Sequence, residues 1–113
     1  MSSRDGAARR LRRCAPVFTA LGDETRLTLL SRLSGGARLS IARLADGSAL
    51  TRQAITKHLR VLEDAGIVRA ARQGRESRFE LQPQRLAEAR RALDDISRQW
   101  DEALARLKAV VEG

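Results

Sequence analysis

The sequence is poor in several residue types, and each scarcity excludes a class of protein. One cysteine, Cys14, cannot form an intramolecular disulfide, and one histidine, His58, leaves little capacity for acid–base catalysis. No apolar run approaches the roughly 20 residues that a membrane span requires, and no apolar stretch of about 7–15 residues follows the basic N-terminus. The 113 residues therefore predict one domain that is not an enzyme and does not enter a membrane. A single free cysteine also suits a reducing compartment, so we expect a cytoplasmic protein.

Positive charge, in contrast, is abundant and unevenly placed. The formal net charge is +8 and is carried mainly by arginine. Residues 1–22 carry +4, residues 23–81 carry another +4, and residues 82–113 contain equal numbers of acids and bases. An excess of this size indicates a polyanionic partner, with nucleic acid as the first candidate, although a merely soluble basic protein would show the same total. The first two thirds of the chain are therefore expected to meet the polyanion, and the last third to have another role.

Helix signals recur through the first 66 residues. Residues 1–13 are polar and rich in Gly, Ser and Arg, which predicts a basic flexible arm. Apolar residues at helical spacing, with capping residues before them and glycines after them, then predict helices over residues 16–21, 23–34, 40–45 and 51–65. The last two of these are joined by a tight turn at Asp46-Gly47-Ser48, an arrangement that is typical of a helix-turn-helix.

Beyond Gly66 the apolar period changes from that of a helix to that of a strand. Ile67 and Val68 begin a strand, residues 77–81 alternate between inward and outward positions, and residues 73–76 supply the turn between them. This pattern predicts a two-stranded wing. The expected fold is mainly α with a small β-hairpin: a winged helix-turn-helix over residues 14–82.

Residues 83–113 predict one long amphipathic helix. Its apolar residues follow one another at intervals of three or four: Leu86, Ala89, Leu93, Ile96, Trp100, Leu104, Leu107 and Val111. A helix from Pro83 to Val111 is roughly 43 Å long, whereas a compact chain of this length has a radius of gyration of about 13 Å. A second copy would cover such a stripe, so we expect a dimerisation helix in the same domain. The alternative is a helix that folds wholly onto its own core.

The helix predicted over residues 51–65 has an apolar face and an opposite polar face. The polar side carries the side chains that major-groove readout uses: Thr51, Arg52, Gln53, Thr56, Lys57 and Arg60. Glutamine pairs bidentately with adenine, arginine and lysine reach the guanine acceptors, and the threonine methyl contacts thymine. The wing adds polar residues that suit phosphates or the adjacent minor groove: Arg72, Gln73, Arg75 and Arg78. An ordinary solvated helix face and a solvated hairpin are the alternatives.

Three segments together resemble the ArsR/SmtB family of bacterial winged-helix repressors. They are Leu21-Gly-Asp-Glu-Thr-Arg-Leu27, the segment from Leu50 to Val68 (LTRQAITKHLRVLEDAGIV), and the wing from Arg72 to Leu81 (RQGRESRFEL). The resemblance implies a homodimer with its interface on the first and last helices, which places Val17, Phe18, Leu93, Ile96, Trp100, Leu104 and Leu107 there. It also implies binding to an imperfect inverted repeat and repression that an effector relieves.

The sequence departs from the metal-sensing members of that family. Residues 41–46 lack the cysteine pair of soft-metal sensors, and the last helix has Asp94, Asp95, Asp101 and Glu102 but no histidine. Zinc sites take nitrogen and sulfur ligands, so one His and one Cys are not enough. We therefore expect no metal and no cofactor. A small organic effector near Trp100 or a redox role for Cys14, whose arginine neighbours favour the thiolate, stays open.

Together these patterns predict a sequence-specific DNA-binding regulator: a homodimeric repressor that binds double-stranded DNA in the bacterial cytoplasm, in association with the nucleoid. No nucleophile–base pair, glycine-rich phosphate loop or metal cluster indicates an enzyme. The main alternative is a chromatin-type basic protein that binds nucleic acid without sequence preference. Such a protein would not discriminate between duplexes at physiological salt.

Overall fold

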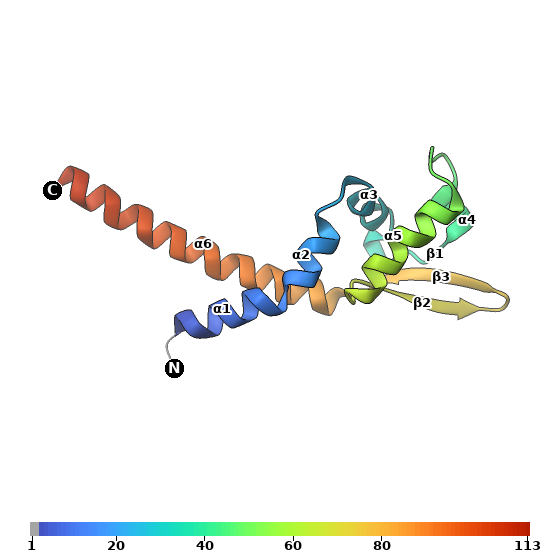
Figure 1. Cartoon of the computed structure of the whole chain (residues 1–113), viewed down its shortest axis with the longest axis horizontal. Coiled ribbons are helices and arrows are strands. Elements are labelled where there is room, and N and C mark those ends of the chain that lie inside the picture. The colour runs from blue at the N-terminus through green and yellow to red at the C-terminus, as the bar shows by residue number, and fades with distance from the viewer. Residues whose placement is uncertain (1–2) are drawn as a thin grey trace.

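The computed structural model describes residues 3–113 as six α-helices and three short strands (Figure 1). The helices are α1 (Ser3–Arg13), α2 (Ala15–Leu21), α3 (Glu24–Arg32), α4 (Ile41–Ala45), α5 (Arg52–Asp64) and α6 (Pro83–Glu112). A 3-10 turn, Ser34–Gly36, follows α3, and the strands are β1 (Leu39–Ser40), β2 (Val68–Gln73) and β3 (Glu76–Leu81). The molecule is elongated, with extents of 66 × 31 × 22 Å, because α6 projects from one end and the β2–β3 hairpin from the other.

Side-chain caps begin the three helices around the helix-turn-helix. Asp23 accepts a hydrogen bond from the Arg26 N–H at 2.9 Å, Ser40 from Arg43 at 3.2 Å and Thr51 from Ala54 at 3.1 Å. Each bond satisfies one N–H group that the first turn of a helix leaves without an intrahelical partner. The predicted caps at residues 23, 40 and 51 are therefore confirmed.

One apolar core joins the helices to the inner face of the sheet. Its buried members come from helices α2 to α6, strands β2 and β3 and the residues beside them: Cys14, Val17, Ala20, Leu29, Leu33, Leu44, Ile55, Leu59, Leu62, Ile67, Val68, Phe79, Ala89 and Ala92. The predicted apolar face of α5, Ile55, Leu59 and Leu62, is fully buried. Because this face is fixed in the core, the opposite face of α5 is turned to solvent.

The sheet contains one strand more than the predicted hairpin. Strands β2 and β3 pair antiparallel from Val68↔Leu81 to Gln73↔Glu76, and β1 adds to the other edge of β3 with Leu39 opposite Phe79. The wing is thus confirmed as a hairpin within a three-stranded sheet. Strand β1 has only two residues and ends at the N-cap Ser40, so it has no periodic pattern that could predict it.

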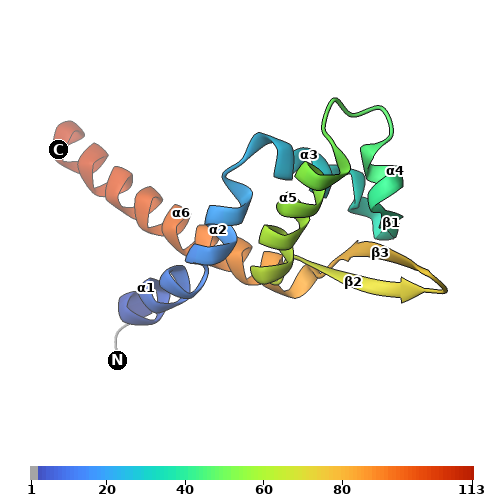
Figure 2. The same cartoon turned by 45° about the vertical axis from the view of Figure 1, so that its right-hand side comes forward.

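The N-terminal segment differs from the flexible arm expected over residues 1–13. Met1 and Ser2 lie outside the described residues, and residues 3–13 form α1, which packs along α6 (Figure 2). Leu11 contacts the core, and the Arg10 guanidinium donates to the Asp95 carboxylate at 2.6 Å. Asp95 is buried and also pairs with Arg98. The predicted arm is therefore corrected to a helix, because tertiary contacts order a segment whose own composition is polar.

Helix α6 has a buried half and an exposed half. Its first half covers the core through Ala89 and Ala92, whereas its second half extends away from the rest of the protomer (Figure 1). The described residues include no helix long and apolar enough to cross a membrane.

Candidate nucleic-acid interface

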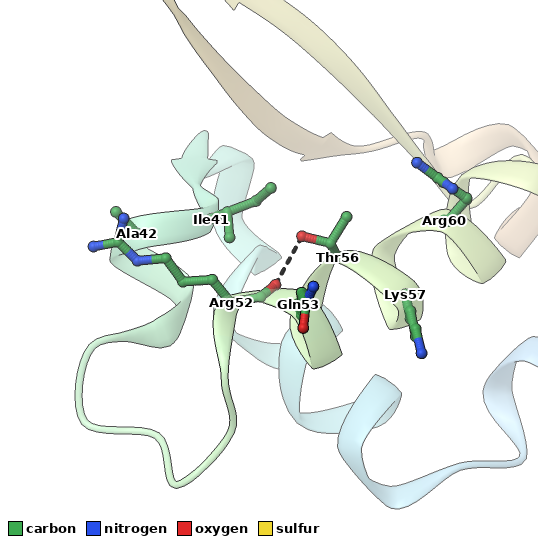
Figure 3. Close-up of a pocket in the computed structure, with 7 residues that line it drawn as sticks. All are labelled: Ile41, Ala42, Arg52, Gln53, Thr56, Lys57 and Arg60. Carbon is green, nitrogen blue, oxygen red and sulfur yellow. Dashed lines mark hydrogen bonds between the residues drawn. The ribbon is translucent and has the colours of Figure 1, made fainter.

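The exposed face of α5 lines an open hollow beside α4. Five of the six residues predicted to read DNA from this helix line it: Arg52, Gln53, Thr56, Lys57 and Arg60 (Figure 3). Its volume is about 570 Å³, and α4 contributes its first two residues, Ile41 and Ala42. The structure therefore brings the predicted helix residues together at one concave surface. Thr51, the sixth, starts the helix, and its hydroxyl oxygen accepts from the Ala54 N–H.

The charged side chains of this hollow are available to a polyanion. Within residues 3–113, the structure shows no ion pair for Arg52, Lys57 or Arg60. The Thr56 hydroxyl, in contrast, already has a hydrogen-bond acceptor. It donates to the Arg52 carbonyl at 2.7 Å, which is the dashed line in Figure 3. The surface therefore presents three cations, the Gln53 amide and a methyl group, which are the groups that bind phosphates and base edges.

A polar cluster around Arg26 of α3 connects α2, α3 and α5. The Arg26 guanidinium donates to the carbonyls of Ala20 (2.6 Å) and Thr19 (3.3 Å), where α2 ends. Its Nη1 lies 3.4 Å from Nδ1 of His58 on α5, and the Asp23 carboxylate lies 3.7 Å from that nitrogen. The sequence singled out Arg26 only as part of a motif, since the partners of its side chain lie outside its own helix, on α2 and α5. His58 belongs to this cluster, where it contacts Arg26 and Asp23 and has a structural role.

The Asp23 carboxylate is stabilised in its charged form. The backbone N–H of Arg26 donates to it and holds the pKa of Asp23 below the ordinary aspartate value, and the nearby Arg26 and His58 side chains act in the same direction. Burial opposes this shift without reversing it. The cap at the start of α3 is therefore an ionised carboxylate at neutral pH.

Glu80 on the central strand β3 connects that strand to β2 and to the residue before β1. It accepts from Arg69 of β2 at 2.6 Å and from Arg38, which precedes β1, at 2.7 Å. The bond from Arg69 is the main cause that holds the pKa of Glu80 below its usual range, and Arg38 adds to it. The sequence pattern places Glu80 on the outward face of its strand but does not predict the contact with Arg38, which lies 42 positions away in the chain. Two of the basic residues around the wing therefore have a structural role.

The predicted wing residues do not all lie on one face. In the strand register Arg72 is opposite Ser77 on the face that carries Phe79, whereas Arg78 is opposite Ala71 on the other face. Arg78 also lies 3.3 Å from the Glu76 carboxylate, and Gln73 pairs with Glu76 beside the turn. Within the described part of the chain, Arg72 and Arg75 have no ion-pair partner. The structure thus favours these two as the free cations of the wing.

The acidic, histidine and cysteine side chains do not gather into a metal site. Across residues 3–113 no three of these groups are close enough together to hold a metal ion. Cys14 is 1% exposed and lies in the core between α1 and α2, so its thiol is not accessible to a second copy.

A helix pair with an exposed cationic face, followed by a β-hairpin, defines a winged helix-turn-helix DNA-binding domain. Residues 21–70 match the family model described as a helix-turn-helix domain. An uncharacterised HTH-type transcriptional regulator of Bacillus subtilis, YuzN, is 45% identical over 65 residues, which cover 52% of this chain and 71% of the relative.

Solved structures give the same assignment. An ArsR-like transcriptional regulator from Rhodococcus sp. RHA1 is 39% identical and has a TM-score of 0.76, with 88% of this chain and 92% of that one covered. The homodimeric winged helix-turn-helix DNA-binding domain of Mb0332 from Mycobacterium bovis shares the fold at 24% identity, with a TM-score of 0.60 over 94% of this chain and 93% of that one. The chain belongs to the ArsR family of helix-turn-helix transcriptional regulators.

Proposed function

We propose that this regulator is a homodimeric, sequence-specific repressor that binds an inverted-repeat operator. The observation that carries the proposal is the hollow beside α5, where Gln53 and the cations Arg52, Lys57 and Arg60 converge. One such surface in each protomer would occupy a major groove. Arg72, Arg75 and Arg78 of the wing, with Gln73 beside them, would contact the flanking backbone. Two protomers related by a two-fold axis would present their α5 helices about 34 Å apart, one turn of DNA.

The apolar stripe of α6 supports the homodimer. Trp100 is 65% exposed, and Leu93, Leu104 and Leu107 are each more than half exposed, although large apolar side chains favour burial. The radius of gyration is 18.5 Å, against about 13 Å for a compact chain of this length. Burial of this stripe by a second copy removes the exposed surface, and the M. bovis domain with this fold is a homodimer.

The proposed dimer interface contains one residue fewer than the sequence predicted. Val17 is 2% exposed within its own protomer, so its assignment to the interface is corrected: it fills the core beneath α2. Phe18 and Ile96 are half-buried and keep surface that a second copy can cover. The interface that we propose is therefore formed by Phe18, Leu93, Ile96, Trp100, Leu104 and Leu107.

Repression follows from occupancy in this proposal, because a dimer that covers promoter DNA excludes the polymerase. A DNA-binding role also places the protein with the bacterial chromosome, in the cytoplasm. The dimer surface near Trp100 is where a small organic effector would act.

The burial of Cys14 opposes a direct redox role. If oxidant changed the DNA affinity of the wild type but not that of Cys14→Ser, this conclusion would be wrong.

The test is in vitro selection from a random duplex library at about 150 mM salt. An enriched inverted repeat with half-site centres roughly 10 base pairs apart supports both the specificity and the two-fold symmetry. Transcription from a promoter that carries the selected site should then fall when the protein is added. Measurable binding without any enrichment contradicts the proposal and favours a general nucleic-acid-binding protein.

A further inference from the structure

Apolar groups lie among the polar ones in the hollow beside α5. Ile41 and Ala42, the first two residues of α4, line the same hollow as Gln53 and Thr56, and both are half-buried (Figure 3). Ile41 packs against the core with part of its side chain and leaves the rest at the surface. These residues were not among those that the sequence predicted to meet DNA, because that prediction was confined to α5 and the wing.

Thr56 adds a third apolar group to this surface. Its hydroxyl donates to the Arg52 carbonyl at 2.7 Å, and Figure 3 shows the methyl group on the side of Thr56 away from that bond. A threonine whose hydroxyl is satisfied by its own helix offers the solvent its methyl group. Ile41, Ala42 and the Thr56 methyl are the apolar part of the lining, here called the apolar patch, and the other lining residues are Arg52, Gln53, Lys57 and Arg60.

The chemistry of the major groove offers one matching group. Among the four bases only thymine presents a methyl group there, and small apolar side chains contact it. Glutamine pairs bidentately with adenine, so the amide of Gln53 beside this patch suits a neighbouring A·T pair. In the free protein Ile41 and Ala42 keep part of their apolar surface in water. Contact with a thymine methyl would remove that surface from water, which is favourable.

We propose that Ile41, Ala42 and the Thr56 methyl form a thymine-reading patch, which contacts the 5-methyl group of one thymine in each half-site. This inference rests on the proposed function and adds to it a base identity and a contribution from α4. Specificity then comes from two elements, with α4 supplying apolar contacts and α5 supplying hydrogen bonds.

The experiment replaces each thymine of the selected half-site, one at a time, with deoxyuridine. Deoxyuridine keeps the base pair and the phosphates and removes only the methyl group, so no protein variant is needed for the first measurement. Loss of one buried methyl contact predicts an affinity reduced about fourfold at one thymine, with smaller changes at the others. Equal affinity for every substituted duplex overturns the inference.

A double-mutant cycle assigns the contact to the patch. In Ile41→Ala, shown to be folded by its thermal transition, deoxyuridine at the sensitive position should cost clearly less than it costs the unchanged protein. In Arg75→Ala, the matched control on the wing, the deoxyuridine penalty should stay in full. An undiminished penalty in Ile41→Ala contradicts the patch while leaving the proposed function in place, whereas failure to select any site contradicts both.

Discussion

The arginine residues of this chain divide into two groups according to what their guanidinium groups contact. Arg26 and Arg69 are bound to carbonyl or carboxylate oxygens of the protein, and each joins its own element to a neighbouring one. Arg60 and Arg75 have no ion-pair partner within residues 3–113. Only the second group keeps its charge available for phosphates, so the net charge overstates the number of residues that are free to bind a polyanion.

Gln53 and Arg75 are expected to have different effects on binding. Gln53→Ala should lower affinity by about 1–3 kcal/mol for the preferred base at one position and should relax the choice there, because it removes a base contact. Arg75→Ala should weaken binding to all duplexes alike and reduce the salt slope by about 1, because it removes a phosphate contact. Titrations of matched and mismatched duplexes at several salt concentrations measure both. Equal losses on every duplex for both variants would show that these roles are wrongly assigned.

Asp23 predicts a dependence of stability on pH. Its pKa is lower in the folded protein than in the unfolded chain, so its contribution is complete above the unfolded value and is lost as the pH falls through the folded value. The free energy of unfolding should therefore fall between neutral pH and strongly acidic pH. Urea titrations of the wild type and of Asp23→Asn, which keeps a capping side chain, measure this. A slope against pH that is the same in both proteins would rule out Asp23 as its source.

At the scale of the elements, most of the fold could be predicted from local signals. The caps at Asp23, Ser40 and Thr51, the glycine after α5 and the period of β3 each depend on neighbouring residues. Gly66 has φ +76°, a conformation that favours glycine, and the Arg85 side chain packs 3.1 Å from where a Cβ atom would lie. Features of this kind can be predicted from the sequence because they depend on residues that are close together in the chain.

The elements that the sequence did not indicate depend on remote partners. Helix α1 is polar and becomes ordered against α6, with the Arg10–Asp95 pair separated by 85 positions. Strand β1 needs β3 beside it, and the Arg38–Glu80 contact likewise spans 42 positions. Periodicity within a short window does not contain such information.

The N-cap of α5, Thr51, offers a direct test of the stability of this helix. Thr51→Ala should lower the free energy of unfolding by about 0.5–2 kcal/mol, because it removes the acceptor of the Ala54 N–H. Thr28→Ala is the matched control: Thr28 is exposed within α3 and donates only to the carbonyl of its own helix, so its change should stay within about 0.5 kcal/mol. Chemical denaturation measures both, and equal effects would argue against the capping role.

The whole molecule has two separate surfaces, a cationic hollow beside α5 and an exposed apolar stripe on α6 that a second copy would cover. The hollow beside α5 lies on the helix-turn-helix, whereas the exposed apolar stripe lies on the second half of α6. Figure 2 shows this half of α6 extending away from α4 and α5. Net charge follows the same division, since residues 82–113 carry equal numbers of acids and bases. One part of the protomer is thus suited to DNA and the other to self-association.

Leu104→Glu should convert the dimer to a monomer. It places a charge in the middle of the exposed stripe, where two copies of it would face apolar surface and one another. Ala105→Glu adds the same charge on the opposite side of α6 and should leave the dimer intact. Sedimentation equilibrium gives the mass of each variant. A monomeric wild type, or a dimer that survives Leu104→Glu, would contradict the proposed interface.

The most direct test of the central claim, a two-fold dimer with one α5 helix in each half-site, is the effect of half-site spacing on affinity. The selected repeat is compared with the same repeat carrying about five additional base pairs, half a turn of DNA, between its half-sites. We predict that the insertion lowers affinity by about 10²-fold or more, to the level of an isolated half-site, because the two hollows can no longer be filled together. An affinity that the insertion leaves unchanged would show that each protomer binds DNA independently.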